Sequence, residues 1–405
     1  MSVKVLYIAT RWPWPVEMGR QRMIAQTLEF AASLGEVHLL SFGDTPKKPA
    51  PDYIRSSAML DMSGTLGIAG SLIARPLLPL QSHLFLNPKA TQAVMEAVER
   101  IRPDVVVFDM ARLSHLAGAI HRRFPDIRLV LDMDDRLSKR YARMLSNETV
   151  ADLGGTFEAR LPGPIRFLVP RLKKLLLRVE KSLMERSERR AAEVFDAILM
   201  VSALEAEELK ADCPGRARVV AFPPLINELP VPPQDFSRSV RFVFIGNAGY
   251  APNAEALELL YRAAVQVSHD ASSADAEYSF QAAGKPLPDA AYEKVEVAGF
   301  VPDLSEFLAG DAVLVAPILQ GTGIKTKIID ALEHSVPVIT TPVGAEGLGL
   351  TEGEHFICVQ GEDDLARACL NIVRCPEARG RLARMAAAAR DKGLTTQNRN
   401  ILKDR

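Results

Sequence analysis

The stretch that most constrains the fold of this chain runs from residue 311 to residue 350. Short apolar runs rich in β-branched residues predict two buried parallel strands, and one helix with a single apolar face lies between them. The parts, in order, are DAVLVAPI, QGTGIKTK, TKIIDALEH, PVITTP and VGAEGL. Strand, glycine loop, helix and strand make a βαβ unit, whose ligands are expected at the carboxyl ends of the strands.

The QGTGIKTK loop carries residues suited to a diphosphate. Gly321 and Gly323 let the backbone approach a ligand closely, and the helix after them directs free N–H groups and its positive dipole end to the same place. Lys325 and Lys327 add two cations, and Asp330 can accept two ribose hydroxyls. These features predict a pocket for a nucleotide diphosphate. The alternative is that the loop is only a turn and that its lysines are solvated.

Two common nucleotide-binding patterns are missing from this stretch. GTGIKTK is neither the dinucleotide fingerprint G-x-G-x-x-G nor the phosphate-binding pattern G-x-x-x-x-G-K-[ST]. The dinucleotide fingerprint is also missing after the first predicted strand. A dinucleotide oxidoreductase is therefore disfavoured.

The stretch GTGIKTKIIDALEHSVPVITTPVGAEGL resembles the donor-binding core of the retaining glycosyltransferases of family 4. LVLDMDDRLSKRYARM and VFDAILMVSALEAEEL resemble the bacterial polysaccharide branch of this family. The resemblance extends to VEVAGFVPDLSEFLAGDAVLVAPI, RFVFIGNAGYAPNAEALELL and KVLYIATRWPWPVEMGRQRMIAQTLEFAASLGEVHLLSF. It implies an α/β protein of the GT-B fold, with two Rossmann-like doubly wound domains and an inter-domain cleft. We expect an acceptor domain over residues 1–222, a donor domain over 223–385 and a tail over 386–405.

The function that the resemblance implies is sugar transfer. A nucleotide diphosphate sugar would be the donor, and a saccharide or lipid-linked saccharide would be the acceptor, in cell-surface polysaccharide synthesis by a hexosyltransferase. The donor is a substrate, and neither a cofactor nor a metal is expected. Two alternatives remain open at this point: a nucleotide-sugar epimerase of GT-B fold and a non-catalytic GT-B binding scaffold.

The donor domain departs from the family at two places. Many members carry Arg and Lys after the first strand of this domain, where this chain has Gly246, Asn247 and Asn253. Phosphate charge should then fall on the lysines, with Lys327 as a catalytic group, and the two asparagines could instead cap the next helix. The resemblance also makes the backbone of Phe300 and Val301 the seat of the base, the alternative for the Phe300 ring being plain core.

The second departure concerns the acidic residues of the family. Two glutamates separated by seven residues are usual, but if Asp330 stands for the second, the first falls on Thr322. Backbone N–H groups from Gly321 to Ile324 could bind the sugar hydroxyls instead. Glu346, in the second glycine loop, is a further candidate near the donor.

Candidates on the acceptor side follow the predicted strands of the first domain. Gly19 and Arg20 match the family's glycine loop after the first strand, and Asp109, Arg112 and His115 follow the strand DVVVF. Asp109 is a candidate catalytic residue, and it is equally suited to cap the next helix.

A cluster of acidic residues ends the strand RLVLDMDD. Asp132, Asp134 and Asp135 lie there, and Asp135 is a candidate catalytic base that would have to reach the acceptor hydroxyl. Capping of the next helix by Asp134 or Asp135 is the alternative.

Residues 165–194 predict one long, basic helix. Between residues 165 and 190 it carries nine Lys or Arg and three Glu, a net charge of 9 − 3 = +6. One predicted apolar face consists of Leu172, Leu175, Leu176, Val179 and Leu183. Such a helix can lie on an anionic membrane surface, and the alternative is a solvated helix packed on its domain.

Composition narrows the class of protein further. A formal net charge of −1 argues against a nucleic-acid binder, and the four cysteines form no C-x-x-C pair. We see neither a secretory leader nor an uncharged run of about 18 residues that could span a membrane. The expected location is therefore cytoplasmic. Peripheral attachment to the inner face of the plasma membrane is a further expectation.

Overall fold

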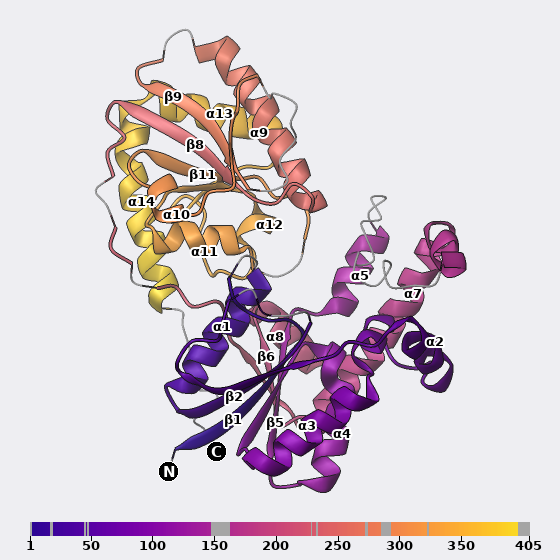
Figure 1. Cartoon of the computed structure of the whole chain (residues 1–405). Helices are drawn as coiled ribbons and strands as arrows, with labels where there is room; N and C mark the ends of the chain where they lie inside the picture. Colours follow the sequence, from indigo (N-terminus) through magenta and orange to yellow (C-terminus); the bar gives the residue numbers. More distant parts are fainter. Residues whose placement is uncertain are drawn as a thin grey trace. The chain divides into compact units, whose positions relative to one another are not determined.

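The structure is a computed structural model of the 405-residue chain, and it describes residues 2–16, 19–43, 46, 48–146, 163–227, 229–231, 234–271, 274–284, 293–321 and 324–395. Within helix α7, the side chains are described from residue 174. The chain divides into two compact units, with the division between Pro223 and Pro224 (Figure 1). Each unit is an α/β layer structure around its own parallel sheet.

The described residues of the first unit form a seven-stranded parallel sheet in the order β3-β2-β1-β4-β5-β6-β7. The strands are β1 (Val3–Ala9), β2 (Gly35–Phe42), β3 (Ile54–Leu60), β4 (Val105–Asp109), β5 (Arg128–Asp134), β6 (Ala197–Met200) and β7 (Arg218–Ala221). Every residue of β4 is buried, as expected of a central strand covered on both faces. The chain order reverses between β1 and β4, so the carboxyl ends of these two strands mark the ligand edge of the unit.

Helices connect these strands. They are α1 (Gly19–Ala32), α2 (Thr65–Ala74), η1 (Leu80–Phe85), α3 (Pro88–Ile101), η2 (Ala111–Leu113), α4 (Ser114–Arg123), α5 (Leu137–Ser146), α7 (Gly163–Val194) and α8 (Ala203–Asp212). Figure 1 shows α2, α3, α4 and α7 gathered on one side of the first sheet, and α4 contacts both α3 and α7.

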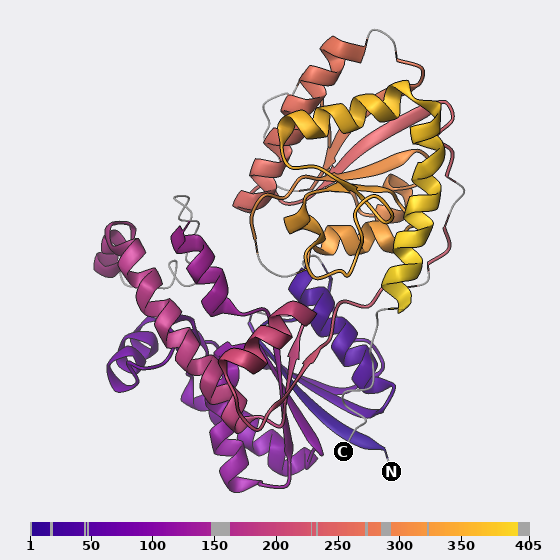
Figure 2. The ribbon, with the colours of Figure 1, turned by 180° about the vertical axis from the view of Figure 1, so that it is seen from behind.

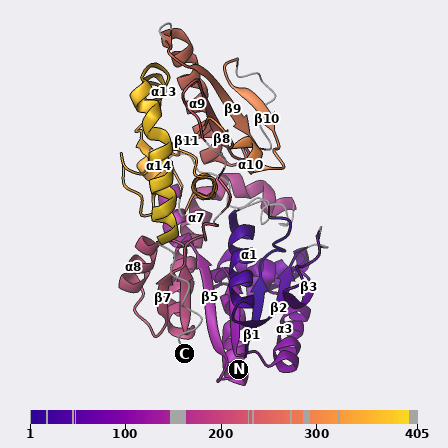
Figure 3. The same cartoon turned by 90° about the vertical axis from the view of Figure 1, so that its left-hand side faces the viewer.

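One strand of this sheet was not predicted. Residues 44–86 were expected to contain only irregular structure and short helices, but β3 pairs with β2 at the sheet edge (Figure 3). The four residues from Arg55 to Ala58 are exposed, so this strand lacks the buried apolar run or the alternation that marks a strand in sequence. Its backbone pairing with β2 holds it in the sheet.

The long helix predicted over residues 165–194 is present as α7, but its packed face differs from the predicted apolar face. Among the described side chains of α7, those buried against the unit are Leu177, Glu180, Met184, Glu188, Ala191 and Ala192. Two members of the predicted face, Leu175 and Val179, are 54% and 44% exposed. Across the described ranges, no helix is both long and apolar enough to cross a membrane.

The second unit contains a six-stranded parallel sheet in the order β10-β9-β8-β11-β12-β13, as far as its residues are described. The strands are β8 (Ser239–Ile245), β9 (Glu277–Ala283), β10 (Glu296–Gly299), β11 (Ala312–Ala316), β12 (Val338–Thr340) and β13 (Ile357–Cys358). The helices are α9 (Ala251–Asp270), α10 (Leu304–Phe307), α11 (Thr326–Glu333), α12 (Pro342–Ala345), α13 (Glu362–Arg374) and α14 (Pro376–Thr395). The chain order reverses between β8 and β11, which places the ligand edge of this unit at their carboxyl ends.

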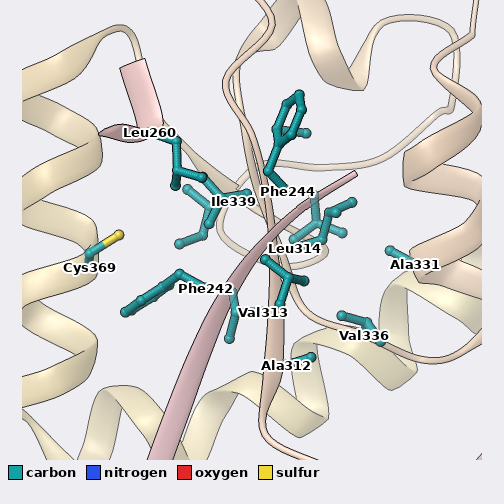
Figure 4. Packing of buried hydrophobic residues seen from close by; sticks show 14 of the residues in the cluster. Phe242, Phe244, Leu260, Ala312, Val313, Leu314, Ala331, Val336, Ile339 and Cys369 are labelled. Carbon is teal, nitrogen blue, oxygen red and sulfur yellow. The ribbon is translucent and has the colours of Figure 1, made fainter. Parts of the chain in front are cut away.

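The core of the second unit lies on both faces of its central strands. Figure 4 shows Leu260 of α9 and Cys369 of α13 on one side of β8 and β11, and Ala331 of α11 on the other. Phe242 and Leu314, from the two central strands, are completely buried. This packing fixes the position of α11, which begins at the ligand edge.

The end of the described chain is one helix. The expected tail began at residue 386, but α14 continues from Pro376 to Thr395, and Figure 2 shows it as a single helix that follows α13. Leu382, Ala386 and Ala389 are buried, so apolar contacts continue across the expected boundary. The described part of that tail therefore belongs to the second unit.

Candidate functional site

The predicted donor residues of the second unit converge at the β8–β11 edge. Gly246 directly follows β8, and Gly321 lies in the loop after β11 with a φ of +129°, a conformation that favours glycine. Lys327, in the first turn of α11, reaches back to Gly246. Thr322 and Gly323, the two central residues of the predicted loop, lie outside the described residues.

Lys327 is the central cation of this edge. Its side chain is nearly buried, with 9% of the residue exposed, and its ammonium group lies 4.3 Å from the centre of the Phe244 ring. Lys327 Nζ donates a 2.7 Å hydrogen bond to Asn253 Oδ1. Burial lowers the pKa of Lys327 to about 7, against the opposing effect of Asp330. A lysine with this pKa is mostly neutral above pH 7 unless a bound anion raises its pKa again.

Gly246 is required by the approach of this lysine. A Cβ atom at position 246 would lie 3.0 Å from Lys327 Nζ and from the Asn253 amide. A side chain at position 246 would therefore crowd the ammonium group and the Asn253 amide. Lys327 Nζ lies directly beside the backbone at Gly246.

The two asparagines of this loop act on the loop and on the lysine. Asn247 Oδ1 accepts a 2.7 Å hydrogen bond from the backbone N–H of Gly249. Asn253 Nδ2 donates a 3.0 Å hydrogen bond to the Asn247 carbonyl oxygen, while its Oδ1 holds Lys327. The helix that follows, α9, has Tyr250 at its N-cap and no capping side chain among the described residues. The alternative that these asparagines cap the helix is therefore wrong.

The remaining predicted donor residues surround the same edge. Lys325 is the N-cap of α11, where no described side chain makes a cap hydrogen bond, and its Nζ lies 3.9 Å from Glu346 Oε2. Asp330 lies one turn further along α11 and interacts electrostatically with Lys327. Ile324 precedes the helix and packs against the core. The start of α11 thus offers backbone donors beside two lysines and two carboxylates.

The predicted base-binding residues lie at the carboxyl end of β10. Phe300 follows this strand directly and is 58% exposed, which excludes the alternative that its ring is plain core. Val301 is next to it and half-buried. An exposed aromatic ring at a strand end can cover the face of a nucleotide base.

Arg20 organises the ligand edge of the first unit. Its Nε donates a 2.7 Å hydrogen bond to Asp109 Oδ1, and its Nη1 lies 3.2 Å from Asp132 Oδ1 and 3.3 Å from Asp134 Oδ1. Gly19 begins α1 directly before it. The three aspartates raise the pKa of Arg20 further above its usual range, against the effect of burial.

Asp109 anchors Arg20 and Thr10, and its catalytic role remains a prediction. It is completely buried, and while Oδ1 binds Arg20, Oδ2 accepts hydrogen bonds from the Thr10 backbone N–H, at 2.7 Å, and from the Thr10 hydroxyl. Burial favours a higher pKa for Asp109, but Arg20 and Thr10 outweigh it and hold the pKa below its usual range. Both oxygens of this buried carboxylate therefore already accept hydrogen bonds within the unit. It does not cap the next helix, whose N-cap is Met110.

The aspartates at the end of β5 interact with two different arginines, Asp134 with Arg20 and Asp135 with Arg140. Asp134 lies beside Arg20, and burial raises the pKa of Asp134 to about 6, with a further rise from Asp135 and Asp132 and an opposing effect from Arg20. Asp135 is 2% exposed and forms an ion pair with Arg140. The catalytic role of Asp135 remains a prediction.

Arg112 and His115 follow β4, and Arg112 interacts electrostatically with Asp109, the partner of Arg20. Burial lowers the pKa of Arg112, and its Nε finds no hydrogen-bond partner among the described residues. His115 Nδ1 lies 3.1 Å from the Arg112 carbonyl oxygen, and burial lowers the pKa of His115 to about 4. His115 lines a separate cavity between helices instead of the strand edge.

Two residues that hydrogen-bond to the aspartates of the first unit were not predicted from the sequence. Thr10 holds Asp109, and Tyr7 donates a 2.8 Å hydrogen bond from its hydroxyl to Asp132 Oδ2. Both lie on or directly after β1, among otherwise apolar residues. The hydroxyl groups of Tyr7 and Thr10, within the otherwise apolar run VKVLYIAT, were the feature of the sequence that could have identified these partners.

Comparisons with known proteins agree with this geometry. Residues 239–375 match the family model of the group 1 glycosyl transferases, and this segment contains the whole β8–β11 edge. A curated relative from Klebsiella pneumoniae, named "Uncharacterized 44.6 kDa protein in cps region", is 30% identical over 69 residues. That match spans 17% of this chain and 18% of the relative.

Solved structures match nearly the whole chain. Sucrose-phosphate synthase from Thermosynechococcus elongatus has a TM-score of 0.64 and 14% identity, covering 98% of this chain and 95% of that one. HepE from Anabaena, in complex with UDP-glucose, has a TM-score of 0.60 and 16% identity, covering 99% and 98%. TarM has a TM-score of 0.63 and 9% identity, covering 100% and 98%. The chain therefore has the GT-B fold, with two Rossmann-like units, and its residues 239–375 match the group 1 glycosyl transferases.

Proposed function

We propose that this protein is a retaining glycosyltransferase of family 4 that moves a hexosyl group from a nucleotide diphosphate sugar to a saccharide or lipid-linked saccharide. The observation that carries the proposal is the position of Lys327. A nearly buried ammonium group lies at the β8–β11 edge, beside Gly246 and at the start of α11. Such an arrangement suits a diphosphate, which is the leaving group of this reaction.

The comparisons support the donor class and the biological setting. The HepE structures contain UDP, UDP with glucose, or UDP-glucose. The name of the Klebsiella pneumoniae relative places that protein in a cps region. On these grounds we extend the proposal to a role in cell-surface polysaccharide synthesis.

Each residue of the donor edge has a proposed task. The backbone N–H groups at the start of α11 bind the diphosphate, and Lys327 neutralises the charge that develops as the sugar leaves. Asp330 accepts the ribose hydroxyls, and the exposed Phe300 ring covers the base. Because lysine and backbone dipoles supply the positive charge, the proposal includes neither a metal nor a cofactor.

The acceptor belongs to the first unit in this proposal. Arg20, with its three aspartates, forms a rigid polar floor at the β1–β4 edge. Asp135 is proposed as the base, because it follows β5 at this edge and Asp109 is already engaged on both oxygens. Rigid polar groups at this edge would orient an acceptor hydroxyl.

Attachment to an anionic membrane is proposed for α7. Leu175 and Val179 are exposed on this helix, next to the exposed residues Lys174 and Arg178. Two of its acidic residues, Glu180 and Glu188, are each 1% exposed and do not offset the basic surface. We accordingly propose a cytoplasmic protein held at the inner face of the plasma membrane.

A thermal-shift panel of UDP, GDP, ADP and dTDP sugars tests the donor site. One nucleotide class should stabilise the wild type, and Lys327→Ala and Asp330→Ala should each reduce that shift. Lys294→Ala is a matched control, because Lys294 is exposed before β10, at the opposite end of the sheet. Unchanged shifts in both site variants would refute the assignment.

Turnover distinguishes the proposed activity from its alternatives. With donor and a saccharide acceptor, we expect a glycosylated product that retains the anomeric configuration of the donor. Release of an epimerised nucleotide sugar without acceptor would show an epimerase instead. Stoichiometric donor binding without any turnover would show a binding scaffold.

A further inference from the structure

The first unit contains a cavity away from the strand edges assigned to sugar transfer. A cavity of about 1040 Å³ opens between α2, α3, α4 and α7, which Figure 1 shows side by side. Its volume is slightly above the range of about 300–1,000 Å³ that is typical of ligand pockets. The described residues that line it include neither Arg20 nor the three aspartates around Arg20.

The charge of this cavity is entirely positive. Four arginines line it, Arg75, Arg122, Arg186 and Arg190, and its lining contains neither Asp nor Glu. Within the described part of the chain, none of the four forms an ion pair. Guanidinium groups around one space repel one another, so an anion between them would be stabilised by several charges at once.

All four arginines are exposed, and one of them, Arg122, lies along the cavity wall. Arg122 Nη1 would lie 3.6 Å from a Cβ atom at position 118, where the residue is glycine. Both residues line the cavity and lie one turn apart on α4. The guanidinium therefore lies along the helix surface, beside Gly118.

A neutral polar group lies at the inner end of the same cavity. His115 Nδ1 lies 3.1 Å from the Arg112 carbonyl oxygen, so this nitrogen carries the ring proton. His115 Nε2 is buried and finds no hydrogen-bond partner among the described residues. Its lone pair can accept a hydrogen bond from the proton of a phosphate monoester, whose second pKa is about 6.

The other walls are apolar and continue to the outside. Leu77, Leu78, Leu86 and Val194 line the cavity, and Leu77 is 57% exposed at its mouth. On the neighbouring helix α2, Leu66 and Ile73 are 89% and 84% exposed. Exposed apolar side chains therefore lie both on the cavity lining and on α2 beside it.

We propose that this cavity binds an organic phosphate monoester that carries an apolar chain. The phosphate lies among the four arginines with His115 beneath it, and the chain lies along Leu77 and Leu78 and leaves past α2. This inference goes beyond the proposed sugar transfer and does not depend on it. The cavity contains none of the residues to which a task in sugar transfer is given, and His115, first predicted for the acceptor side, lines the cavity instead. The same chemistry could come from a soluble amphiphile or from the head group of a membrane lipid.

Calorimetric titration with octyl phosphate, below its micelle concentration, tests the proposal. Octyl phosphate should bind at least about tenfold more tightly than inorganic phosphate and than octyl glucoside, because only octyl phosphate uses both the arginines and the apolar wall. Equal affinity for inorganic phosphate would exclude the apolar part, and equal affinity for octyl glucoside would exclude the arginines. Either result would overturn the proposal.

Three variants locate the binding. The double variant Arg186→Gln/Arg190→Gln should weaken octyl phosphate binding by about tenfold or more. Gly70→Leu should also weaken it, because Gly70 lines the cavity and a Cβ there meets open space, so a larger side chain fits the helix and fills the cavity. Arg189→Gln is the matched control, because Arg189 is exposed on the same helix and outside the lining.

Thermal unfolding of each variant without ligand checks that it is folded. If octyl phosphate binds the folded double variant and the folded Gly70→Leu variant as tightly as wild type, it binds elsewhere and the proposal fails. Flotation with phosphatidylcholine vesicles, with and without phosphatidic acid, then identifies the source. Recruitment by phosphatidic acid that is lost in the double variant supports a lipid head group, and binding of octyl phosphate alone supports a soluble ligand.

Discussion

Donor binding should depend on pH through Lys327. This lysine lies nearly buried beside Phe244, and burial lowers its pKa to about 7. A bound diphosphate places negative charge next to the ammonium group and raises its pKa again. Above pH 7 the free protein therefore holds mostly neutral lysine, and donor binding requires the uptake of one proton.

The size of the effect follows from the pKa. For each pH unit above about 7, protonating Lys327 costs about 1.4 kcal/mol, which lowers donor affinity by about tenfold. Below that pH the lysine is already charged, so affinity should level off. A nucleotide sugar is the right ligand for this measurement, because its diphosphate is esterified at both ends and does not titrate in this range.

Calorimetric titration of the nucleotide sugar between pH 6 and 9, in buffers of different ionisation enthalpy, measures both the affinity and the proton uptake. Lys327→Met should remove the proton uptake and flatten the profile above pH 7, while Lys325→Met should weaken binding but keep the slope. A wild-type affinity that does not change from pH 7 to 9 would refute the reasoning. So would a slope that persists in Lys327→Met.

Three further results are expected. Arg20→Met leaves Asp109 buried without its cation, so it should lower the free energy of unfolding by about 3–5 kcal/mol in denaturant titrations; a loss below about 1 kcal/mol would contradict the anchoring role. Without ligand, Lys327→Met should raise the thermal midpoint of unfolding at pH 7. The pKa of Lys327 in the folded protein lies below its unfolded value of 10.5, so the stability of the wild type is lost as pH falls towards about 7. An unchanged midpoint would argue against a free-energy cost of burying Lys327. Activity should survive EDTA, since lysine and backbone donors supply the positive charge, and a metal requirement would appear as loss of turnover that Mg²⁺ or Mn²⁺ restores.

Local patterns predicted most of the fold. The βαβ unit over residues 311–340 was predicted from its buried runs and glycine loop, and it is present as β11, α11 and β12. Lys327 was placed beside the loop correctly, because a residue at the start of a helix after a parallel strand must lie at the ligand edge. The edge strand β3 was missed, because its exposed side chains carry no apolar pattern.

Contacts between distant residues could not be predicted. Arg20 and Asp109 are 89 residues apart, and nothing in either local pattern shows that they meet. The hydrogen bond from Lys327 to Asn253 likewise joins two helices that are far apart in the sequence. His115 was assigned to the acceptor edge from its place after β4, but the turn through η2 directs it into the cavity between helices. These contacts depend on how helices and strands that are distant in the sequence pack together, and local sequence patterns do not show that packing.

A crystal structure of the protein with its nucleotide sugar tests the central claim most directly. The account predicts the diphosphate at the β8–β11 edge, with one of its oxygens about 2.7–3.2 Å from Lys327 Nζ and others facing the first N–H groups of α11. A diphosphate bound anywhere else, with Lys327 still on Asn253 and away from any phosphate oxygen, would contradict it.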